Sequence, residues 1–554
     1  MALPLPDKPS IAVLPFDNLS ADPQQGYFVD GMTEDLITDL SKLSGIFVIA
    51  RNSSWVYKGK PTKVQQVAED LGVRYVLEGS VQREGDRVRI NAQLIDAIRG
   101  EHLWADRYDG TINDVFGLQD KVIRQIVGAL AIELTSTEQA QAGQPETTNP
   151  EAYDAVLRGW NHLHEDTEEG TLKAIADFQK AIGLDPGYGR AYAAMAAAYL
   201  RIVVSDWETA SGAGFEHASE SMRKNLAKAL ERPTSLAYAV SAEILMLEGR
   251  YDEAFAMIDK AVALAPNDPE NYIAKAKILN ASGRAAEAEQ AARMAMRFDP
   301  QFSPGTLRVL ALSLFHQEKY QDAIDTLRRV LSQESDVEED YATLVSSLGH
   351  LGRHDGVQDA IDKFNAISTA SGFDQLTVQE MGWWWYGDMF SYDDTYRARL
   401  QEGLRLAGVP EGAGTDLALA DYKRLIVRKE GEYDVLGITE IDAPTAKVLH
   451  DRGVVFVDVR GAGDYDNGHI PGARNLSLAT RLSKESLAKV AGKGDEVVFS
   501  CMGKYCSYSA YASAKAVLWG YTHVYRFAGG FPAWQDAGYP TETHKTATGI
   551  TQTP

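Results

Sequence analysis

The chain passes from strand to helix in the stretch VVFSCMGKYCSYSAYASAKAVLWG, residues 497–520. Its opening residues are apolar and rich in β-formers, which predicts a buried strand of a parallel sheet. A helical pattern begins at Ser507, after a loop of only six residues. Ligand sites in open parallel α/β sheets lie at the carboxyl ends of the strands. We therefore expect a reacting group at Cys501, where this strand ends.

The sequence on both sides of this stretch contains further segments that are expected to form strands of the same sheet. VVFVDVR (454–460) is a second apolar run bounded by charge, as a buried parallel strand should be. GHIPGARNL (468–476) follows it, and HVYRFAGGFPAW (523–534) leads into the start of a last helix. Strands that alternate with helices in this way predict an α/β domain with a central parallel sheet.

The loop after Cys501 has the features of an anion site. A short strand–loop–helix turn directs backbone N–H groups and a helix N-terminus inward, which favours an anion. The same field lowers the pKa of a thiol, and the thiolate is the nucleophile. This arrangement suits a thiolate that attacks sulfur and then holds a persulfide. The predicted cradle around the catalytic Cys501 consists of Met502, Gly503, Lys504, Tyr505, Cys506 and Ser507.

Several phrases of this region resemble the rhodanese family over roughly residues 438–541. The matching residues are Asp458-Val459-Arg460, Asp464-Tyr465, Gly468-His469-Ile470-Pro471-Gly472-Ala473, Asn475, Cys501, Gly529-Gly530-Phe531 and Trp534. The resemblance implies that Cys501 accepts sulfane sulfur from a donor such as thiosulfate and passes it to a thiophilic acceptor. It implies structural, loop-supporting roles for Asp458 and Arg460, and a structural role for His469. It implies no cofactor.

The loop departs from the family's common pattern in two respects. Met502 stands where the family often has Arg, and Gly503 comes earlier than the usual glycine. Lys504 is the only basic residue of the loop, which leaves little positive charge for doubly charged thiosulfate. The loop keeps the six-residue body of sulfur-transferring members. Phosphatases of this fold need a longer loop with Arg, and residue 507 is Ser.

Two interpretations of Cys506 stay open. Cys506 lies five residues after Cys501. It is either a resolving thiol, which closes a disulfide on a persulfide or sulfenate, or a small core residue at the helix start. Two cysteines cannot form a disulfide framework, so we expect no dependence on an oxidising compartment. They are too few for a four-cysteine zinc site, and we expect no metal.

The middle of the chain is repetitive and helical. Gly249-Arg250-Tyr251-Asp252-Glu253-Ala254 is echoed by Gly283-Arg284-Ala285-Ala286-Glu287-Ala288, 34 residues later. A 34-residue unit of two helices is the tetratricopeptide (TPR) signature. We count about five units, with an irregular one near 201–235. Such a solenoid either presents a concave surface to a protein or peptide partner, or only spaces the two ends of the chain.

Two segments after the repeats carry weaker signals. GWWWYGDMF (382–390) is interpreted as an aromatic cluster that closes the solenoid, or as an exposed contact. DYKRLIV (421–427) is predicted to form one helix within a linker.

The N-terminal region mixes strands and helices. Its expected strands include residues 10–16 and 47–51, and its helices include 64–72 and one that starts at Thr33. The phrases SIAVLPFDNLSADP, YFVDGMTEDLITDLSKL and LGVRYVLEGSVQREGDRVRINAQLIDA resemble the TolB amino-terminal-type domain. That domain often follows an adenylate cyclase domain in bacterial regulators, and we find no cyclase domain here. Residues 51–54 are interpreted as a binding loop or as a turn that caps a strand.

Charge and hydropathy exclude two classes of partner. The 554 residues carry 55 Lys and Arg against 78 Asp and Glu, a net charge of −23. Such a chain repels phosphate backbones, so we expect no nucleic-acid partner. It has no run of ~18 apolar residues that would span a membrane. The N-terminal residues lack the pattern of a signal peptide, so a cytoplasmic location is expected.

The sequence therefore predicts a multidomain protein. We expect a TolB N-terminal-like α/β domain at 9–140, an all-α TPR solenoid at 150–366, a solenoid cap and linker at 367–437, and an α/β rhodanese domain at 438–541. The favoured function is a sulfurtransferase or persulfide carrier whose TPR array recruits a partner. The alternative is a regulatory or scaffold protein without catalysis, in which the rhodanese domain senses redox or sulfur state.

Overall fold

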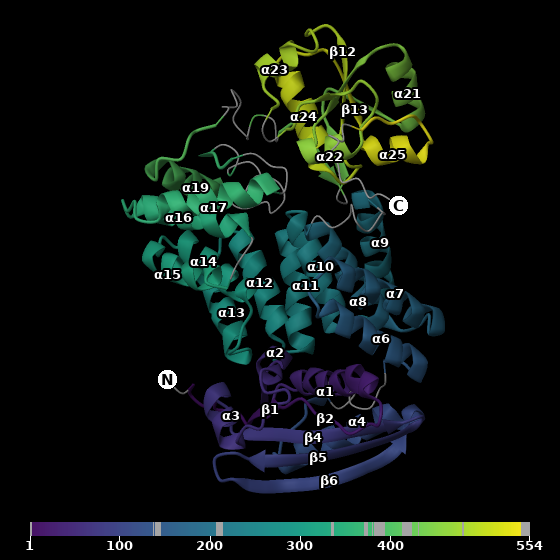
Figure 1. Cartoon of the computed structure of the whole chain (residues 1–554), viewed down its shortest axis with the longest axis vertical. Helices are drawn as coiled ribbons and strands as arrows, with labels where there is room; N and C mark the ends of the chain where they lie inside the picture. The colour runs from purple at the N-terminus through teal and green to yellow at the C-terminus, as the bar shows by residue number, and fades with distance from the viewer. Residues whose placement is uncertain are drawn as a thin grey trace, which may run out of the picture.

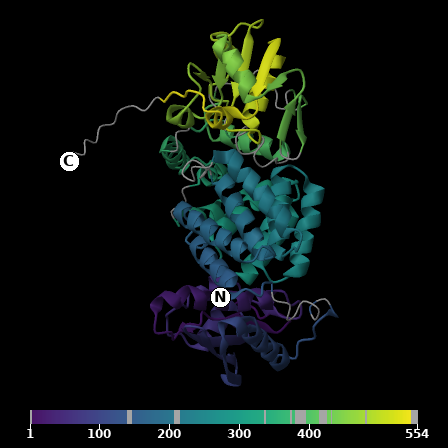
Figure 2. The same ribbon diagram turned by 90° about the vertical axis from the view of Figure 1, so that its right-hand side faces the viewer.

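The computed structural model has three parts stacked along its longest axis (Figure 1). The N-terminal α/β part lies at one end, the helical repeats form the middle, and the C-terminal α/β part lies at the other end, as the rotated view also shows (Figure 2). This arrangement confirms the predicted fold class. The structure describes residues 3–136, 138, 146–205, 214–333, 337–370, 375–378, 381, 394–412, 421, 424–429, 432–478 and 481–543.

The N-terminal part is built on a mixed sheet with the strand order β3-β1-β4-β5-β6. β1 is parallel to both of its neighbours, whereas β4, β5 and β6 form an antiparallel meander. Helices α1 and α4 share one apolar core with this sheet. The strands are β1 (Ser10–Val13), β2 (Asp17–Asn18, paired with β4), β3 (Phe47–Val48), β4 (Tyr75–Glu84), β5 (Arg87–Asp96) and β6 (Glu101–Thr111). The helices are α1 (Gly26–Ser41), α2 (Arg51–Trp55), α3 (Val64–Leu71) and α4 (Val115–Ala129).

Two predictions for this part were wrong in their bounds. The first helix begins at Gly26 rather than at Thr33, because Phe28 and Val29 are buried in the same core as its later apolar residues. The strand predicted over 47–51 ends at Val48, and Arg51 starts the short helix α2. The binding loop predicted at 51–54 is therefore helical.

The middle part is a TPR-like solenoid of helix pairs. The described residues form six pairs, one more than the sequence count of about five. The pairs are α6 (Pro150–Leu163) with α7 (Glu168–Leu184), α8 (Gly189–Val204) with α9 (Gly214–Ala229), α10 (Ser235–Leu247) with α11 (Tyr251–Leu264), α12 (Pro269–Ala281) with α13 (Ala285–Phe298), α14 (Pro304–His316) with α15 (Tyr320–Leu331), and α16 (Glu338–His350) with α17 (Val357–Ala370).

The 34-residue period has a backbone cause. Gly249, Gly283 and Gly352 each lie between the two helices of a pair, with φ of 72°, 81° and 63°. This left-handed conformation is easy for glycine, and it reverses the chain after the first helix. Glu318 takes the same place in the intervening pair with φ of 63°, although it is not glycine. The turn therefore keeps the same backbone geometry in this repeat although the residue is different.

The segment after the solenoid differs from the expected linker helix. α19 (Asp394–Leu406) packs against α16, and a hairpin of β7 (Ile426–Lys429) and β8 (Glu432–Val435) follows. The helix predicted over 421–427 is contradicted at its end, because Ile426 and Val427 pair with β8 rather than continue a helical turn. The aromatic cluster predicted at 382–390 lies outside the described residues.

The C-terminal part is a five-stranded parallel sheet with the order β11-β10-β12-β13-β9. Alternate residues of the central strand face two separate cores: Val497 and Phe499 pack with α23 and α24, whereas Val498 packs with α21 and α25. The strands are β9 (Thr439–Ile441), β10 (Val455–Asp458), β11 (Arg474–Asn475), β12 (Glu496–Ser500) and β13 (His523–Phe527). The helices are α21 (Ala443–Asp451), α22 (Ala462–Asn467), α23 (Lys484–Ala488), α24 (Ser507–Leu518) and α25 (Gly530–Asp536).

The N-terminal part contacts the solenoid at two places that are distant in the sequence. At the first, Asp35 of α1 accepts a hydrogen bond from the Tyr153 hydroxyl at 2.5 Å and pairs with Arg190 at 2.7 Å. At the second, the Asn52 amide of α2 donates to Asp299 at 3.1 Å, and the Ser53 hydroxyl also donates to Asp299. The N-terminal part therefore joins the start of the solenoid to its α13–α14 turn.

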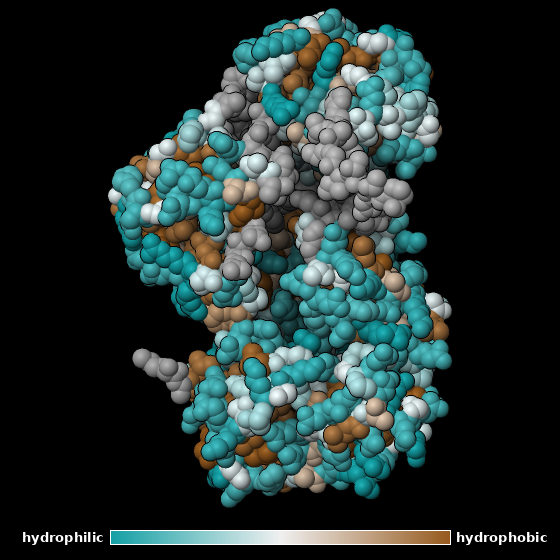
Figure 3. Space-filling model, viewed as in Figure 1, coloured by the Kyte–Doolittle hydropathy of each residue, from teal (hydrophilic) through white to brown (hydrophobic). Residues whose placement is uncertain are grey.

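The surface is mainly hydrophilic on the face shown in Figure 3, with apolar residues scattered over all three parts. Among the described residues, no helix is both long enough and apolar enough to cross a membrane.

Candidate functional site

Cys501 follows directly after β12, the central strand of the parallel sheet. It is 1% exposed, and its carbonyl oxygen accepts a hydrogen bond from the Phe531 N–H at 2.9 Å. The structure therefore places the predicted nucleophile at the carboxyl edge of the sheet. The strand, the six-residue loop and α24 follow one another as the sequence pattern predicted.

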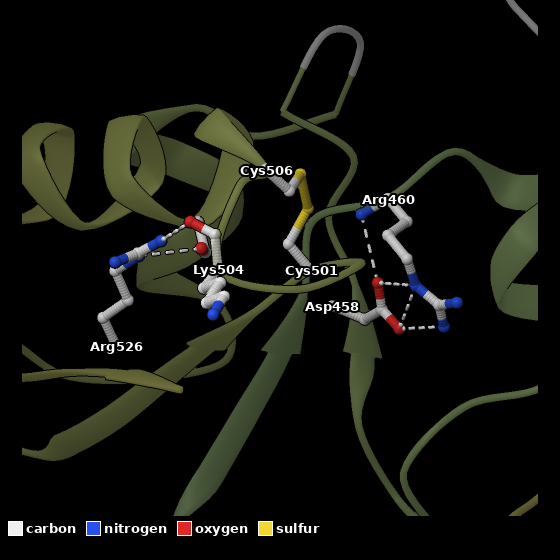
Figure 4. Close-up of a disulfide and its surroundings, with 7 residues drawn as sticks. Asp458, Arg460, Cys501, Lys504, Cys506 and Arg526 are labelled. Carbon is white, nitrogen blue, oxygen red and sulfur yellow. Dashed lines mark hydrogen bonds and ion pairs between the residues drawn. A yellow bond between two sulfur atoms is a disulfide. The ribbon is translucent and has the colours of Figure 1, made fainter. Parts of the chain in front are cut away.

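Cys501 and Cys506 form a disulfide within the loop (Figure 4). Their Cα atoms are 6.5 Å apart, and Cys506 is 6% exposed at the N-cap of α24. The Cys506 N–H donates to the Gly503 carbonyl at 3.1 Å, which closes the loop on itself. Neither sulfur is a free thiol in this state. Both interpretations of Cys506 apply to its position, since it is buried and also bonded to Cys501.

A buried ion pair lies at the end of β10, the strand next to β12 (Figure 4). The Arg460 guanidinium donates to both carboxylate oxygens of Asp458, with a closest distance of 2.6 Å. It also donates to the Gly468 carbonyl at 2.7 Å, which ties β10 to the segment before β11. His469 is fully buried, and its Nδ1 lies 2.7 Å from the Tyr465 carbonyl. These contacts place Asp458, Arg460 and His469 in the framework around the loop.

One residue that holds the loop was not predicted from the sequence. Arg526 of β13 is 1% exposed, and its guanidinium donates to the Lys504 carbonyl at 3.3 Å and to the Ser509 hydroxyl at 3.0 Å (Figure 4). It also pairs with Glu440 at 2.9 Å. Burial lowers the pKa of Arg526 from its ordinary value. The signal in the sequence was an arginine inside the otherwise strand-like run HVYRF, since a charge in a buried strand needs a partner.

The remaining loop residues divide between the core and the solenoid. Met502 packs against the core of the C-terminal part, and Gly503 has φ of 135°, which favours glycine. Ser507 is the first residue of α24. The ring of Tyr505 lies 5.1 Å from the guanidinium of Arg223, a residue of solenoid helix α9. The loop thus forms part of a contact between two domains.

Lys504 does not stand alone as the cation of an anion cradle. Its Nζ lies 2.9 Å from a Glu220 carboxylate oxygen and 3.5 Å from a Glu432 carboxylate oxygen. The hydrogen bond with Glu220 raises the pKa of Lys504. Glu220 belongs to α9 and Glu432 to β8, so both partners come from outside the sheet. The positive charge predicted for the loop is therefore already paired.

Comparisons with known families assign each part of the chain. The rhodanese-like domain matches residues 443–537. The anaphase-promoting complex, cyclosome, subunit 3 family matches residues 247–330, within the repeats. The second domain of HilA/YgeH-like transcriptional regulators matches residues 7–126. The resemblance of this last region to the TolB amino-terminal type stays a prediction.

The chain is similar to individual proteins over limited stretches. It is 37% identical to thiosulfate sulfurtransferase GlpE of Pseudomonas savastanoi over 101 residues, which are 18% of this chain and 87% of that protein. It is 49% identical to putative adenylate cyclase 3 of Rhizobium meliloti over 207 residues, 37% of this chain. The match spans 35% of that relative, so the chain covers about a third of its length.

A rhodanese-like domain from Anabaena sp., determined in solution, is also similar. It is 24% identical, the match covers 21% of this chain and 89% of that domain, and the TM-score is 0.18.

Proposed function

Because the chain belongs to the rhodanese family through its C-terminal domain, we propose that it is a sulfurtransferase or persulfide carrier with Cys501 as its nucleophile. The observation that carries this proposal is the place of Cys501 at the end of the central strand, in a short loop that leads into α24. The helix N-terminus and the loop backbone favour a thiolate there.

The proposed transfer has two displacement steps. The Cys501 thiolate attacks the outer sulfur of thiosulfate, the S–S bond of thiosulfate breaks, and sulfite leaves with the electron pair. An acceptor thiolate then attacks the outer sulfur of the Cys501 persulfide. The Cys501 thiolate leaves, and the acceptor carries the persulfide. Asp458 and Arg460 hold the neighbouring strand end, while Cys501 performs the chemistry.

The disulfide adds a reductive step before transfer. A dithiol reductant supplies two electrons and two protons, opens the Cys501–Cys506 bond, and leaves as its own disulfide. We propose further that Cys506 is a resolving cysteine. Its thiolate attacks the Cys501 sulfur of the persulfide, and hydrosulfide leaves with the electron pair as the disulfide forms again. A repeated cycle of this kind needs a reducing compartment, and the cytoplasm is the proposed location.

The solenoid is the proposed recruitment surface. TPR-like repeats are a protein-interaction architecture, and their stacked helices present an extended surface to a partner. In this proposal the partner is a protein that supplies or accepts the sulfur.

Mass spectrometry of the intact, reduced chain tests the proposal. The parent protein is incubated with thiosulfate beside Cys501→Ala, and a gain of about 32 Da on the parent alone is expected for a persulfide at Cys501. Cys506→Ser gains the same mass and keeps it longer if Cys506 resolves the persulfide. Equal decay in the parent and in Cys506→Ser would instead make Cys506 structural.

One alternative function is favoured by a specific observation. Cys501 is locked in a disulfide and Lys504 is paired by carboxylates, as suits a scaffold that senses redox state without transferring sulfur. No mass gain from thiosulfate or from a persulfide donor would overturn the enzyme proposal and favour this alternative.

A further inference from the structure

The irregular unit of the solenoid contacts the proposed sulfur-transfer loop. Helix α9 belongs to the second helix pair and lies on the side of the solenoid that faces the C-terminal part (Figure 1). Its residue Glu220 pairs with Lys504 at 2.9 Å. A Cβ atom built on Gly503 would lie 3.1 Å from Cβ and from a carboxylate oxygen of Glu216. Arg223 lies over the ring of Tyr505. Three successive loop residues, 503–505, therefore each meet one side chain of α9.

The three contacting side chains share one face of the helix. Glu216, Glu220 and Arg223 are spaced by four and three residues, which places them in one row along an α-helix. Arg223 is held in turn by Glu248 at 2.7 Å, a residue at the end of α10. The row is therefore anchored in the solenoid as well as in the loop. It forms a wall of defined position beside the loop.

This wall carries two carboxyl groups, those of Glu216 and Glu220, and its one guanidinium, that of Arg223, is already paired with Glu248. Lys504 is the one cation of the loop and faces two carboxylates, those of Glu220 and Glu432, which together leave a net negative charge. Glu216 adds a third carboxyl group, and burial raises its pKa while Lys504 acts in the opposite direction. The ammonium group of the loop is therefore matched by carboxylates of α9 and β8.

We propose that Glu220 and Glu216 of the solenoid are specificity-determining residues of the sulfur-donor site, and that they favour singly charged donors over doubly charged ones. This inference rests on the proposed role of Cys501 as nucleophile. Its physical basis is that the Coulomb energy between donor and wall is proportional to the donor's charge. A dianion is therefore repelled twice as strongly, in free energy, as a monoanion in the same position.

Two donors of matched chemistry separate charge from reactivity. Thiosulfate is a dianion and releases sulfite when a thiolate takes its outer sulfur. Methanethiosulfonate is a monoanion, and the same attack breaks its S–S bond and releases methanesulfinate with the electron pair. Both leave one sulfur on Cys501. Their ratio of kcat/KM therefore reports how the site treats the second negative charge.

The test uses the full chain, reduced, with cyanide as the sulfur acceptor and thiocyanate as the measured product. Glu220→Gln is expected to raise kcat/KM about threefold for methanethiosulfonate and about tenfold for thiosulfate, because removing one charge acts twice on the dianion. Glu216→Gln is also expected to raise kcat/KM for both donors. Glu231→Gln is the control, since Glu231 is exposed, lies beyond α9 and pairs with Lys228.

Salt provides a second readout that a structural role of Glu220 would not change. Higher ionic strength screens the wall, so the thiosulfate to methanethiosulfonate ratio of the parent should rise with salt. The same rise should be weaker in Glu220→Gln.

The outcomes separate this inference from the proposed function. If the parent turns over both donors and the ratio is the same in Glu220→Gln, Glu216→Gln and Glu231→Gln, the specificity role is wrong and the enzyme proposal stands. If no donor is turned over and none loads Cys501, the enzyme proposal fails and the inference fails with it.

Discussion

Gly530 brings the last helix of the C-terminal part against the backbone of the loop. Its φ is 59°, and a Cβ atom there would lie 2.0 Å from the Cys501 carbonyl oxygen, which is a severe steric overlap. The next residue, Phe531, donates its N–H to that same carbonyl. Only a residue without a side chain allows this approach. The position of Cys501 thus depends on a glycine that is 29 residues further along the chain.

Replacing Gly530 by Ala is expected to destabilise the loop by about 3 kcal/mol, from a left-handed penalty and a steric collision together. Gly538→Ala is the matched control, because Gly538 has φ of 72° and open space around it. It should cost only the left-handed part, about 1–2 kcal/mol. Hydrogen exchange of the peptide over residues 496–518 measures the difference. Equal loss of protection in both variants would show that the close approach is unimportant.

Glu34 and His164 make opposite contributions to the pH dependence of stability. Burial raises the pKa of Glu34 to about 7. The stability that the protonated Glu34 contributes is therefore present below its unfolded pKa of about 4.5 and is lost as the pH rises through 7. Burial, aided by Arg51 and Arg201, lowers the pKa of His164 to about 3, so its contribution is lost as pH falls below its unfolded value of 6.5. The two effects oppose each other between about pH 4.5 and 6.5.

The two single variants should therefore tilt the pH profile in opposite directions. Urea unfolding of Glu34→Gln is expected to show a steeper loss of stability from pH 6.5 to 4.5 than the parent, because only the His164 effect remains. His164→Gln should lose stability as the pH rises over the same range. Parallel profiles in all three proteins would contradict this assignment.

At the scale of the element, the short helix α2 acts as a connector between two domains. Ser53 and Asn52 donate to Asp299 at the turn between α13 and α14, and the Gln301 N–H donates to the Ser53 hydroxyl at 2.8 Å. The equivalent residue one repeat earlier is Ala265, which shows that the solenoid itself does not need an acid there. Asp299 therefore serves the contact with α2.

Asp299→Ala is expected to destabilise this contact by about 2–3 kcal/mol, because the Ser53 and Asn52 side chains lose their charged acceptor. Hydrogen exchange should rise at residues 47–57 and stay unchanged in the sheet strand β5. Asp259→Ala makes the same chemical change at an exposed ion pair with Lys275 and should have little effect. An unchanged exchange rate at 47–57 in Asp299→Ala would show that α2 is held by other contacts.

The sequence predictions succeeded where a structure depends on local interactions and failed where it depends on contacts between distant residues. The strand–loop–helix order around Cys501 was predicted, because apolar runs and helix periodicity are local. The 34-residue echo that begins at Gly249 and Gly283 was found for the same reason. The hairpin β7–β8 was missed because its apolar run was too short to separate strand from helix, and its pairing decided the outcome.

The candidate site was predicted in its residues but not in its surroundings. Cys501 and Cys506 were both identified from the sequence, but the disulfide that joins them was left as one of two alternatives. The partner of Lys504 could not be predicted, since Glu220 lies on another domain and no local pattern connects the two. Arg526 was missed because its role depends on Glu440 and on the Lys504 carbonyl, which are distant in the sequence.

For the whole molecule, a buried polar network joins the N-terminal part to the first repeats. Asp35 accepts from Tyr153 and pairs with Arg190, and the Tyr153 hydroxyl also accepts from the Gln119 amide at 2.9 Å. Arg190 is largely shielded, with 15% of its side chain exposed. A shielded guanidinium that loses its carboxylate partner is strongly destabilising.

Asp35→Asn keeps the shape and removes the charge, so the unfolding free energy is expected to fall by about 3 kcal/mol. Asp30→Asn on the same helix should cost less than about 1 kcal/mol, because its partner Lys58 is half exposed. Thermal unfolding of both full-length variants is the measurement. Equal melting temperatures would mean that the network adds nothing beyond the apolar contacts around it.

The double attachment of the N-terminal part has an evolutionary consequence. Repeat arrays commonly change length by gaining or losing whole units. Here Arg190, near the start of α8, and Asp299, just after α13, are both held by one sheet domain. One unit inserted or deleted between them would carry the second anchor away from its partner. Descendants of this chain should therefore change the amino-acid sequence of those repeats while keeping the number of repeats.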